Sequence, residues 1–142
     1  MVLSAEDCKL LQSTWAKLAP FTDDIGADSL NRLFRVFPKT KVYFSHLDLT
    51  PGSSDIRAHG HKVMKALESA LKHLDDVHGT LAELGDKHAY NLRVDPVNFK
   101  LLAKCFHVVL ATHLKAEYTA PVYRAWDKFF FLVADVLTEH YR

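Results

Sequence analysis

The sequence predicts an all-α fold in one domain, residues 1–142, and three observations lead to this class. Apolar residues recur along most of the chain at the three- and four-residue spacing of a single helix face. Glycine and proline number only five each, so long helices joined by short corners are expected. No stretch alternates apolar and polar residues over the length that a strand needs.

Capping signals place the elements of the first half of the chain. Ser4 precedes two acidic residues, which is the pattern of an N-cap followed by acids that oppose the helix dipole. This first helix should end at Pro20, and the second should run until Pro38 opens a short third piece. Residues 45–55, SHLDLTPGSSD, are rich in turn formers and predict a loop. A long helix is expected over about 54–74.

The second half follows the same rules. The stretch that begins LAELGDKHAY predicts a helix that ends near Leu92. Asp95 and Pro96 then restart the chain, because aspartate is a good N-cap and proline loses nothing at the first helical position. Thr119 opens the last helix, which carries more large apolar residues than one core stripe uses. This excess fits either a surface that faces a partner or a broad internal stripe with scattered exposed aromatic residues.

Composition and motifs exclude several classes of function. The net charge of +1 gives no electrostatic case for nucleic acid, and no apolar run has the length of a membrane span. The start, MVLSAEDCKLL, lacks the pattern of a secretory signal, and two cysteines are too few for a disulfide framework. A cytoplasmic protein is therefore expected. Hydrolase, metalloprotease and nucleotide-binding motifs are missing from the sequence, so we do not expect an enzyme.

Two histidines occupy positions where apolar residues are expected. His88 falls on a helical stripe with Leu81, Leu84 and Leu92, and His59 interrupts the apolar face of the preceding long helix. Antiparallel packing of these two helices would direct both rings into one space. A buried ring nitrogen without a partner costs about 1–3 kcal/mol, so each ring needs a hydrogen bond or a metal.

The residues expected around this space decide between the two possibilities. Periodicity alone favours the simpler interpretation, in which each ring hydrogen-bonds to a neighbouring carbonyl in the core. The expected lining, however, is apolar and almost free of carboxylates, whereas zinc and calcium sites usually need three or more protein ligands. An apolar slot with an imidazole on each side suits haem, a flat cofactor that brings its own metal. This lining comprises Phe44, Val63, Leu67, Leu84, Leu92, Val94, Phe99, Leu102 and Leu137.

Specific motifs along the whole chain resemble those of the globins, and most closely the alpha-type chains of vertebrate haemoglobins. They are FP-KTK-YF within 37–44, AHGHKV at 58–63, LRVDPVNFKLL at 92–102, DKF at 127–129 and VLTEHYR at 136–142. HAYNLRVDPVNFKLL and FHVVLATHL are most similar to the alpha-D or mu-like branch. The resemblance implies a globin fold of about seven to eight helices around a haem pocket, with haem b (iron protoporphyrin IX) as cofactor.

The same resemblance assigns roles to residues that match its motifs. It implies that His88 is the proximal ligand of the haem iron and that His59 is the distal residue, facing bound oxygen. Phe44 would wedge the haem, and Val63 would crowd its distal side. The full set of implied haem contacts is Tyr43, Phe44, His46, His59, Lys62, Val63, Leu67, Leu84, His88, Leu92, Val94, Asn98, Phe99, Leu102 and Leu137.

The resemblance also implies partners: molecular oxygen, and a beta-type globin chain in a cooperative alpha2beta2 tetramer of the red blood cell. Tyr141 and Arg142 would form ion pairs that hold the low-affinity state. The tight contact with the beta-type chain would include Arg32, Lys104, Cys105, Tyr118, Tyr123 and Asp127. The sliding contact would include Lys39, Val42, Tyr43, Arg93, Asp95, Val97 and Asn98. The alternatives are a haem enzyme, such as a nitric-oxide dioxygenase or peroxidase, and a haem-free helical interaction module.

Several positions depart from the usual alpha-chain pattern. Lys87 stands before the proximal histidine, where leucine is usual, so altered packing on the proximal side is expected. Lys39, Val42 and Ser45 replace two threonines and a proline at the sliding contact. His140 replaces a lysine near the C-terminus, where its titration would modify proton linkage.

Overall fold

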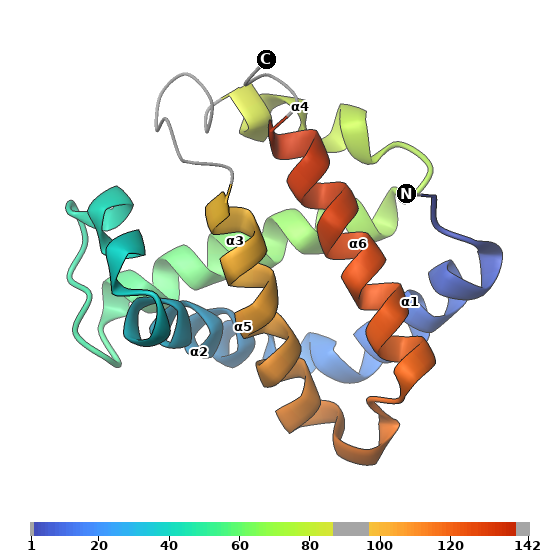
Figure 1. The fold of residues 1–142 in the computed structure, drawn as a ribbon, viewed down its shortest axis with the longest axis horizontal. Coiled ribbons are helices and arrows are strands. Elements are labelled where there is room, and N and C mark those ends of the chain that lie inside the picture. Colours follow the sequence, from blue (N-terminus) through green and yellow to red (C-terminus); the bar gives the residue numbers. More distant parts are fainter. Residues whose placement is uncertain (1, 87–96, 139–142) are drawn as a thin grey trace.

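The structure is a computed structural model, and it describes residues 2–86 and 97–138, apart from the side chains at 83, 85 and 86 (Figure 1). The α-helices in these ranges are α1 (Ala5–Leu18), α2 (Thr22–Val36), α3 (Ser54–Lys72), α4 (Val77–Asp86), α5 (Val97–Leu114) and α6 (Ala120–Thr138). Three 3-10 helices join them: η1 (Ala19–Phe21), η2 (Pro38–Phe44) and η4 (Lys115–Glu117). The described ranges contain no strand, and the all-α prediction is confirmed.

The predicted helix boundaries agree closely with the structure. Helix α1 ends just before the 3-10 turn that contains Pro20, and α6 follows Thr119, as expected. Helix α3 ends two residues earlier than predicted, at Lys72, because His73 leaves the helical conformation with φ −131° and ψ 51°. The predicted end near Leu92 and the predicted cap at Asp95 lie outside the described residues.

A capping box fixes the start of α1. The Ser4 hydroxyl accepts a hydrogen bond from the Asp7 N–H at 3.0 Å, and the Asp7 carboxylate accepts one from the Ser4 N–H at 2.9 Å. The same carboxylate accepts a hydrogen bond from Lys128 of α6 at 2.9 Å. The hydrogen bond from the Ser4 N–H lowers the pKa of Asp7 most, and the hydrogen bond from Lys128 lowers it further. One side chain therefore caps α1 and ties it to α6.

The core forms around α6, which crosses in front of α3 in Figure 1. Trp126 and Phe129 are fully buried there, and the Trp126 indole N–H donates to the hydroxyl of Thr14 at 2.9 Å. The large apolar residues of α6 extend beyond its core face, as expected: Trp126, Phe129 and Phe130 point into the core. Phe131 alone among these four aromatic residues is exposed, with 47% of its surface accessible.

Two glycines set the contact between α2 and α3. A Cβ atom added to Gly60 would lie 2.7 Å from the carbonyl carbon of Gly26, and one added to Gly26 would lie 2.6 Å from the carbonyl oxygen of Gly60. Both distances are shorter than any side chain tolerates, so the two backbones touch where neither residue has a side chain. This contact fixes the position of α3, the helix that carries His59.

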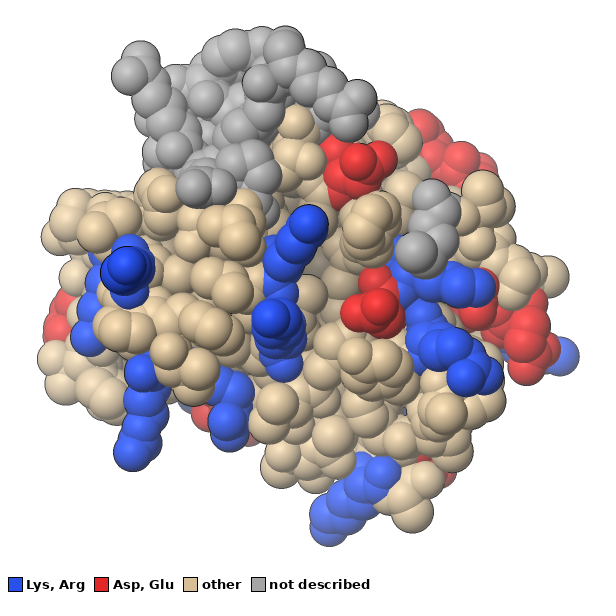
Figure 2. Space-filling view, viewed as in Figure 1, with Lys and Arg blue, Asp and Glu red and all other residues tan. Residues whose placement is uncertain are grey.

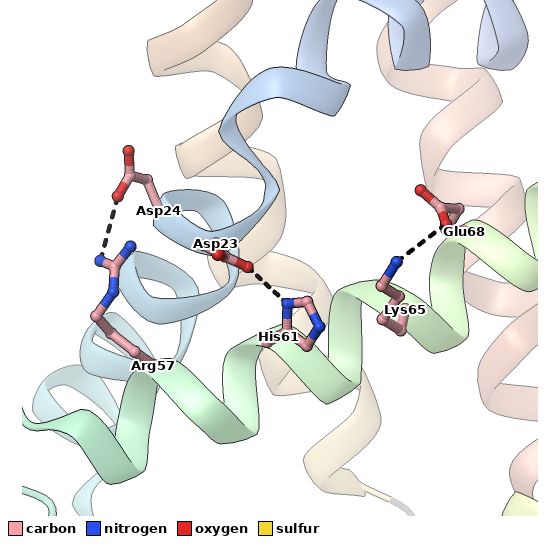
Figure 3. Close-up of polar contacts among 6 residues, drawn as sticks. All are labelled: Asp23, Asp24, Arg57, His61, Lys65 and Glu68. Carbon is pink, nitrogen blue, oxygen red and sulfur yellow. Dashed lines mark hydrogen bonds and ion pairs between the residues drawn. The ribbon is translucent and has the colours of Figure 1, made fainter.

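Ion pairs flank the glycine contact on the outside (Figure 3). Two acidic residues in the first turn of α2 face basic residues of α3: Asp24 pairs with Arg57 at 3.2 Å, and Asp23 pairs with the Nδ1 atom of His61 at 2.8 Å. The hydrogen bond from His61 lowers the pKa of Asp23. These side chains are about half exposed, so the ion pairs contribute little to the free energy of unfolding. Their main effect is to orient α2 and α3 relative to each other.

Membrane insertion through a helix finds no support within the described ranges. None of their helices combines the length and the apolar character that crossing a bilayer requires.

We predict that Gly60→Ala lowers the free energy of unfolding by about 2–3 kcal/mol, because the new methyl group must push α2 away from α3. Chemical denaturation followed by far-ultraviolet circular dichroism measures this change. Gly52→Ala is the control: Gly52 has φ +84° and open space around it, so this change adds backbone strain without a clash and should cost about 1 kcal/mol. Equal losses for the two variants would contradict a close helix contact at Gly60.

We predict that Asp7→Asn removes about 1 kcal/mol of stability at neutral pH, because it weakens the capping box and the pair with Lys128. Since the folded-state pKa of Asp7 is lowered, its contribution is fully present above the unfolded pKa and is lost as pH falls through the folded pKa. The wild-type advantage over Asp7→Asn should therefore shrink in acid. Glu6→Gln, next to it on the exposed surface, should change stability little at either pH.

Candidate functional site

An apolar cavity of about 200 Å³ lies among α3, α4, α5 and α6. All but two of its lining residues are apolar, and none is a carboxylate. The two polar residues are His59 and Lys62, both on α3. The lining comprises His59, Lys62, Val63, Ala66, Leu67, Leu81, Leu84, Phe99, Leu102, Ala103, Phe106, Phe130, Val133, Ala134 and Leu137.

Eight residues that the sequence assigned to the haem site lie together in this lining. They come from four helices and from positions up to 78 residues apart (137 − 59), so only the tertiary fold brings them together. They are His59, Lys62, Val63, Leu67, Leu84, Phe99, Leu102 and Leu137.

The remaining assigned residues lie elsewhere or outside the described ranges. Phe44 of η2 stands beside the cavity, with its ring centroid 5.2 Å from that of His59 in an edge-to-face arrangement. Tyr43, His46 and Asn98 do not line the cavity, and His46 is exposed. The predicted residues outside the described ranges are His88, Leu92 and Val94.

Seven lining residues were not assigned to the site from the sequence: Ala66, Leu81, Ala103, Phe106, Phe130, Val133 and Ala134. A signal for them existed, because most stand three, four or seven positions from an assigned residue on the same helix. Ala66 is three residues after Val63, for example, and Val133 is four before Leu137. Extending each helix face by one or two turns would have found them.

His59 is the one imidazole among the cavity-lining residues that the structure describes. Helix α3 holds it half-buried, and the ring of Phe44 limits its orientation through the edge-to-face contact. Phe44 is itself held by Phe34 of α2, with ring centroids 5.0 Å apart. Lys62, three residues further along α3, is exposed, so its ammonium group lies at the rim of the cavity.

This donor set fits a cofactor that brings its own metal. Within the described ranges, no three histidine, cysteine, aspartate or glutamate side chains are close enough to hold a metal ion. A flat apolar molecule with a central metal needs little more than an imidazole and a dry, apolar surround. The lining supplies both, and Lys62 at the rim supplies a positive charge for acidic groups on the edge of the cofactor.

The outer surface shows no concentration of positive charge on the face drawn in Figure 2. Lysine and arginine side chains there form a few small groups separated by uncharged residues, and acidic residues lie beside the group at the right. This face, formed by α5 and α6, offers nothing that resembles a site for a polyanion.

Comparison with known proteins agrees with the all-α fold. The globin family profile matches residues 27–137. Haemoglobin subunit alpha-D of Erythrolamprus miliaris is 65% identical over 141 residues, which cover 99% of this chain and 100% of that protein. The alpha-D subunits of Drymarchon melanurus erebennus and Sphenodon punctatus are 64% and 55% identical over the same shares. The chain therefore belongs to the globin family, among the alpha-type haemoglobin chains of vertebrates.

Proposed function

We propose that this chain binds haem b in the α3–α6 cavity and transports oxygen reversibly as one subunit of a haemoglobin tetramer. One observation carries the proposal: the cavity is apolar, has no carboxylate, and presents the half-buried imidazole of His59. Membership of the globin family supports oxygen transport by the chain. The proposal also names haem b as the cofactor, a beta-type globin chain as the partner and the red blood cell as the location.

Bound haem supplies ferrous iron, the centre at which oxygen binds reversibly. In the proposal, the imidazole of His88 would hold the iron as its proximal ligand. His59, which lines the cavity from α3, would offer an N–H to the partial negative charge of an oxygen molecule there. The apolar lining excludes water and protons, which favours reversible binding over oxidation, so we propose carriage without catalytic turnover.

The neighbours of His59 restrict where its ring can point. Phe44 packs edge-on against the ring and itself packs against Phe34. One side of the imidazole therefore contacts an aromatic ring that a second ring holds in place. Val63, one turn further along α3, lines the same cavity and narrows the space beside the ligand. Lys62 at the rim pairs with a haem carboxylate in the proposal. Tyr43, His46 and Asn98 stay predicted contacts of the haem edge.

Exposed apolar side chains support assembly with a second globin chain. The large apolar residues exposed on the described surface include Val42, Val97, Tyr123 and Phe131, and the first three belong to the predicted contacts. Such residues, when clustered, mark interaction surfaces. Cys105, also predicted at the tight contact, is only 2% exposed, so its thiol packs inside the subunit and does not form part of that outer surface. Burial accordingly raises its pKa.

We predict that His88→Gly abolishes stable haem attachment, because the iron then loses its only protein ligand on the proximal side. The Soret absorbance per chain after purification and gel filtration measures the haem content. His73→Gly, which changes an exposed histidine just after α3, is the matched control and should keep a full complement of haem. Full haem content in the His88→Gly protein would refute the proximal assignment.

We predict that His59→Leu speeds oxygen dissociation about tenfold, because the hydrogen bond that it removes is worth about 1.5 kcal/mol. The variant should also oxidise faster to the ferric form. Stopped-flow replacement of oxygen by carbon monoxide measures the first rate, and the visible spectrum over hours measures the second. His61→Leu, on the outer side of the same helix, should leave both rates close to wild type. Unchanged rates in His59→Leu would contradict its distal role.

A further inference from the structure

A cluster of polar and aromatic side chains joins α5 to α6 on the outer side of the molecule. This His107 cluster comprises His107 of α5, Tyr118 from the segment after η4, and Tyr123 and Asp127 of α6. The Nδ1 atom of His107 is hydrogen-bonded to the Tyr118 hydroxyl, and its Nε2–H donates to the Asp127 carboxylate at 3.0 Å. The imidazole also stacks on the ring of Tyr123, with ring centroids 4.2 Å apart. One side chain therefore contacts all three others.

These hydrogen bonds do not depend on the charge of the imidazole. An ionised carboxylate only accepts, so Nε2 carries the proton in the hydrogen bond to Asp127. Burial raises the pKa of Tyr118, so its hydroxyl keeps its proton. A hydroxyl can donate as well as accept, so that of Tyr118 donates to Nδ1 of a neutral ring and accepts from Nδ1 of a charged one. Both ring nitrogens of His107 therefore stay engaged in either state.

The members of the cluster differ in how far they reach the surface. Only 11% of the His107 side chain is exposed, whereas Tyr123 is 44% exposed and the Asp127 side chain 58%. Tyr118 is partly buried, and its ring meets that of Tyr123 edge-on, with centroids 6.1 Å apart. His107 is thus the inner member of the cluster, and the side chains that it contacts form the outer surface.

The packing of α5 on α6 has a separate basis in the core. The buried rings of Phe106 and Phe130 stack there, with centroids 5.3 Å apart and an angle of 17° between their planes. Phe130 also meets the imidazole of His107 edge-on at 5.3 Å, so His107 rests on this rigid pair. The specific effect of His107 is therefore to order exposed side chains, since the two helices already pack through their phenylalanines.

Order of this kind favours binding. An exposed side chain that is free to rotate must be immobilised when a partner covers it, and each such side chain raises a dissociation constant roughly twofold to tenfold. His107 immobilises Tyr118, Tyr123 and Asp127 within the folded subunit. A partner that contacts these three side chains then meets a surface that is already arranged.

The same surface indicates what a partner must present. Tyr118, Tyr123 and Asp127 all belong to the tight contact predicted with the beta-type chain. The exposed Phe131 lines the same outer cavity as Tyr123 and Asp127. His107 bonds to Oδ1 of Asp127, and no other described residue donates to the second oxygen. The surface thus fits an apolar patch of the partner with a hydrogen-bond donor at its edge.

We propose that His107 is a positioning residue for subunit assembly: it holds Tyr118, Tyr123 and Asp127 in the arrangement that a beta-type chain binds. The proposal rests on the assembly described under Proposed function. It assigns to His107 no contact with haem or oxygen.

The first test is the dissociation constant of the haem-loaded chain and a vertebrate haemoglobin beta chain, measured by sedimentation velocity. His107→Ala should weaken association about tenfold, because the surface side chains must then be ordered during binding. His113→Ala is the matched control, since His113 is a half-buried histidine of the same helix that contacts Phe21 instead, and it should leave the dissociation constant unchanged. A wild-type dissociation constant in His107→Ala would overturn the proposal.

A double-mutant cycle separates positioning from a general loss of structure. In a chain that already carries Tyr123→Ala, the further change His107→Ala should cost much less than it does in the wild-type chain, because Tyr123 no longer needs to be held. Equal losses in the two backgrounds would show that His107 does not act through Tyr123 and would refute the role proposed for it.

A third measurement needs no partner. Carbon-13 relaxation on the carbon-monoxide form of the isolated chain should show the exposed ring of Tyr123 as rigid as a buried ring, and His107→Ala should make it mobile. A mobile Tyr123 ring in the wild-type chain, or an equally rigid one in His107→Ala, contradicts the positioning role even if the two chains associate. Failure of the wild-type chains to associate would instead refute the proposed assembly, and the role of His107 with it.

Discussion

The contact between the backbones of α2 and α3 at Gly26 and Gly60 is the constraint on which the site depends. Helix α3 supplies five residues to the cavity lining, so its position determines the position of His59. One face of α3 must touch α2 closely while another stays open toward α4 and α6. Glycine at both contact points lets the backbones approach, and the half-exposed ion pairs beside them set the register without adding much stability. The neighbour of Gly60 in the chain is His59, so this backbone contact and the imidazole that lines the cavity share one helical turn.

The cavity is the second consequence of this packing. Protein interiors are normally packed as densely as organic crystals, so an apolar cavity of about 200 Å³ leaves the side chains that line it without part of their packing contacts. Val63, Leu84, Phe99 and Leu102 keep part of their apolar surface accessible there, at a cost of roughly 25 cal/mol for every Å² left in water. A flat apolar cofactor would cover these surfaces together. The proposed haem thus contributes to the stability of the fold as well as to its function.

Sequence reasoning located the helices and part of the site because both follow from local rules. The Ser4 cap and the turn at Pro20 depend on residues a few positions apart. His59 and Leu67 could be assigned because both fall on the apolar face that the period of one helix defines. Periodicity indicated that the apolar residues of α6 extend beyond one face, but it could not show which of them are exposed, because it gives the direction of a side chain and not the element that covers it. Phe130 is buried against α5 and Phe131 is exposed, although both are large, apolar and adjacent. The His107 cluster depends on contacts between residues up to twenty positions apart, which no local pattern contains.

Helices α5 and α6 connect the two parts of the proposed function. Four residues, Phe99 and Ala103 of α5 with Phe130 and Ala134 of α6, line both the inner cavity and a second, outer cavity of about 530 Å³ between these helices. A single layer of side chains therefore separates the proposed haem from the proposed partner surface. This shared layer couples oxygen binding to subunit assembly only when its side chains have two arrangements. Oxygen binding and assembly must each favour one of these arrangements over the other. When the layer has two such arrangements, thermodynamic linkage makes the coupling reciprocal. Assembly must then change the free energy of oxygen binding by the same amount that oxygen changes the free energy of assembly.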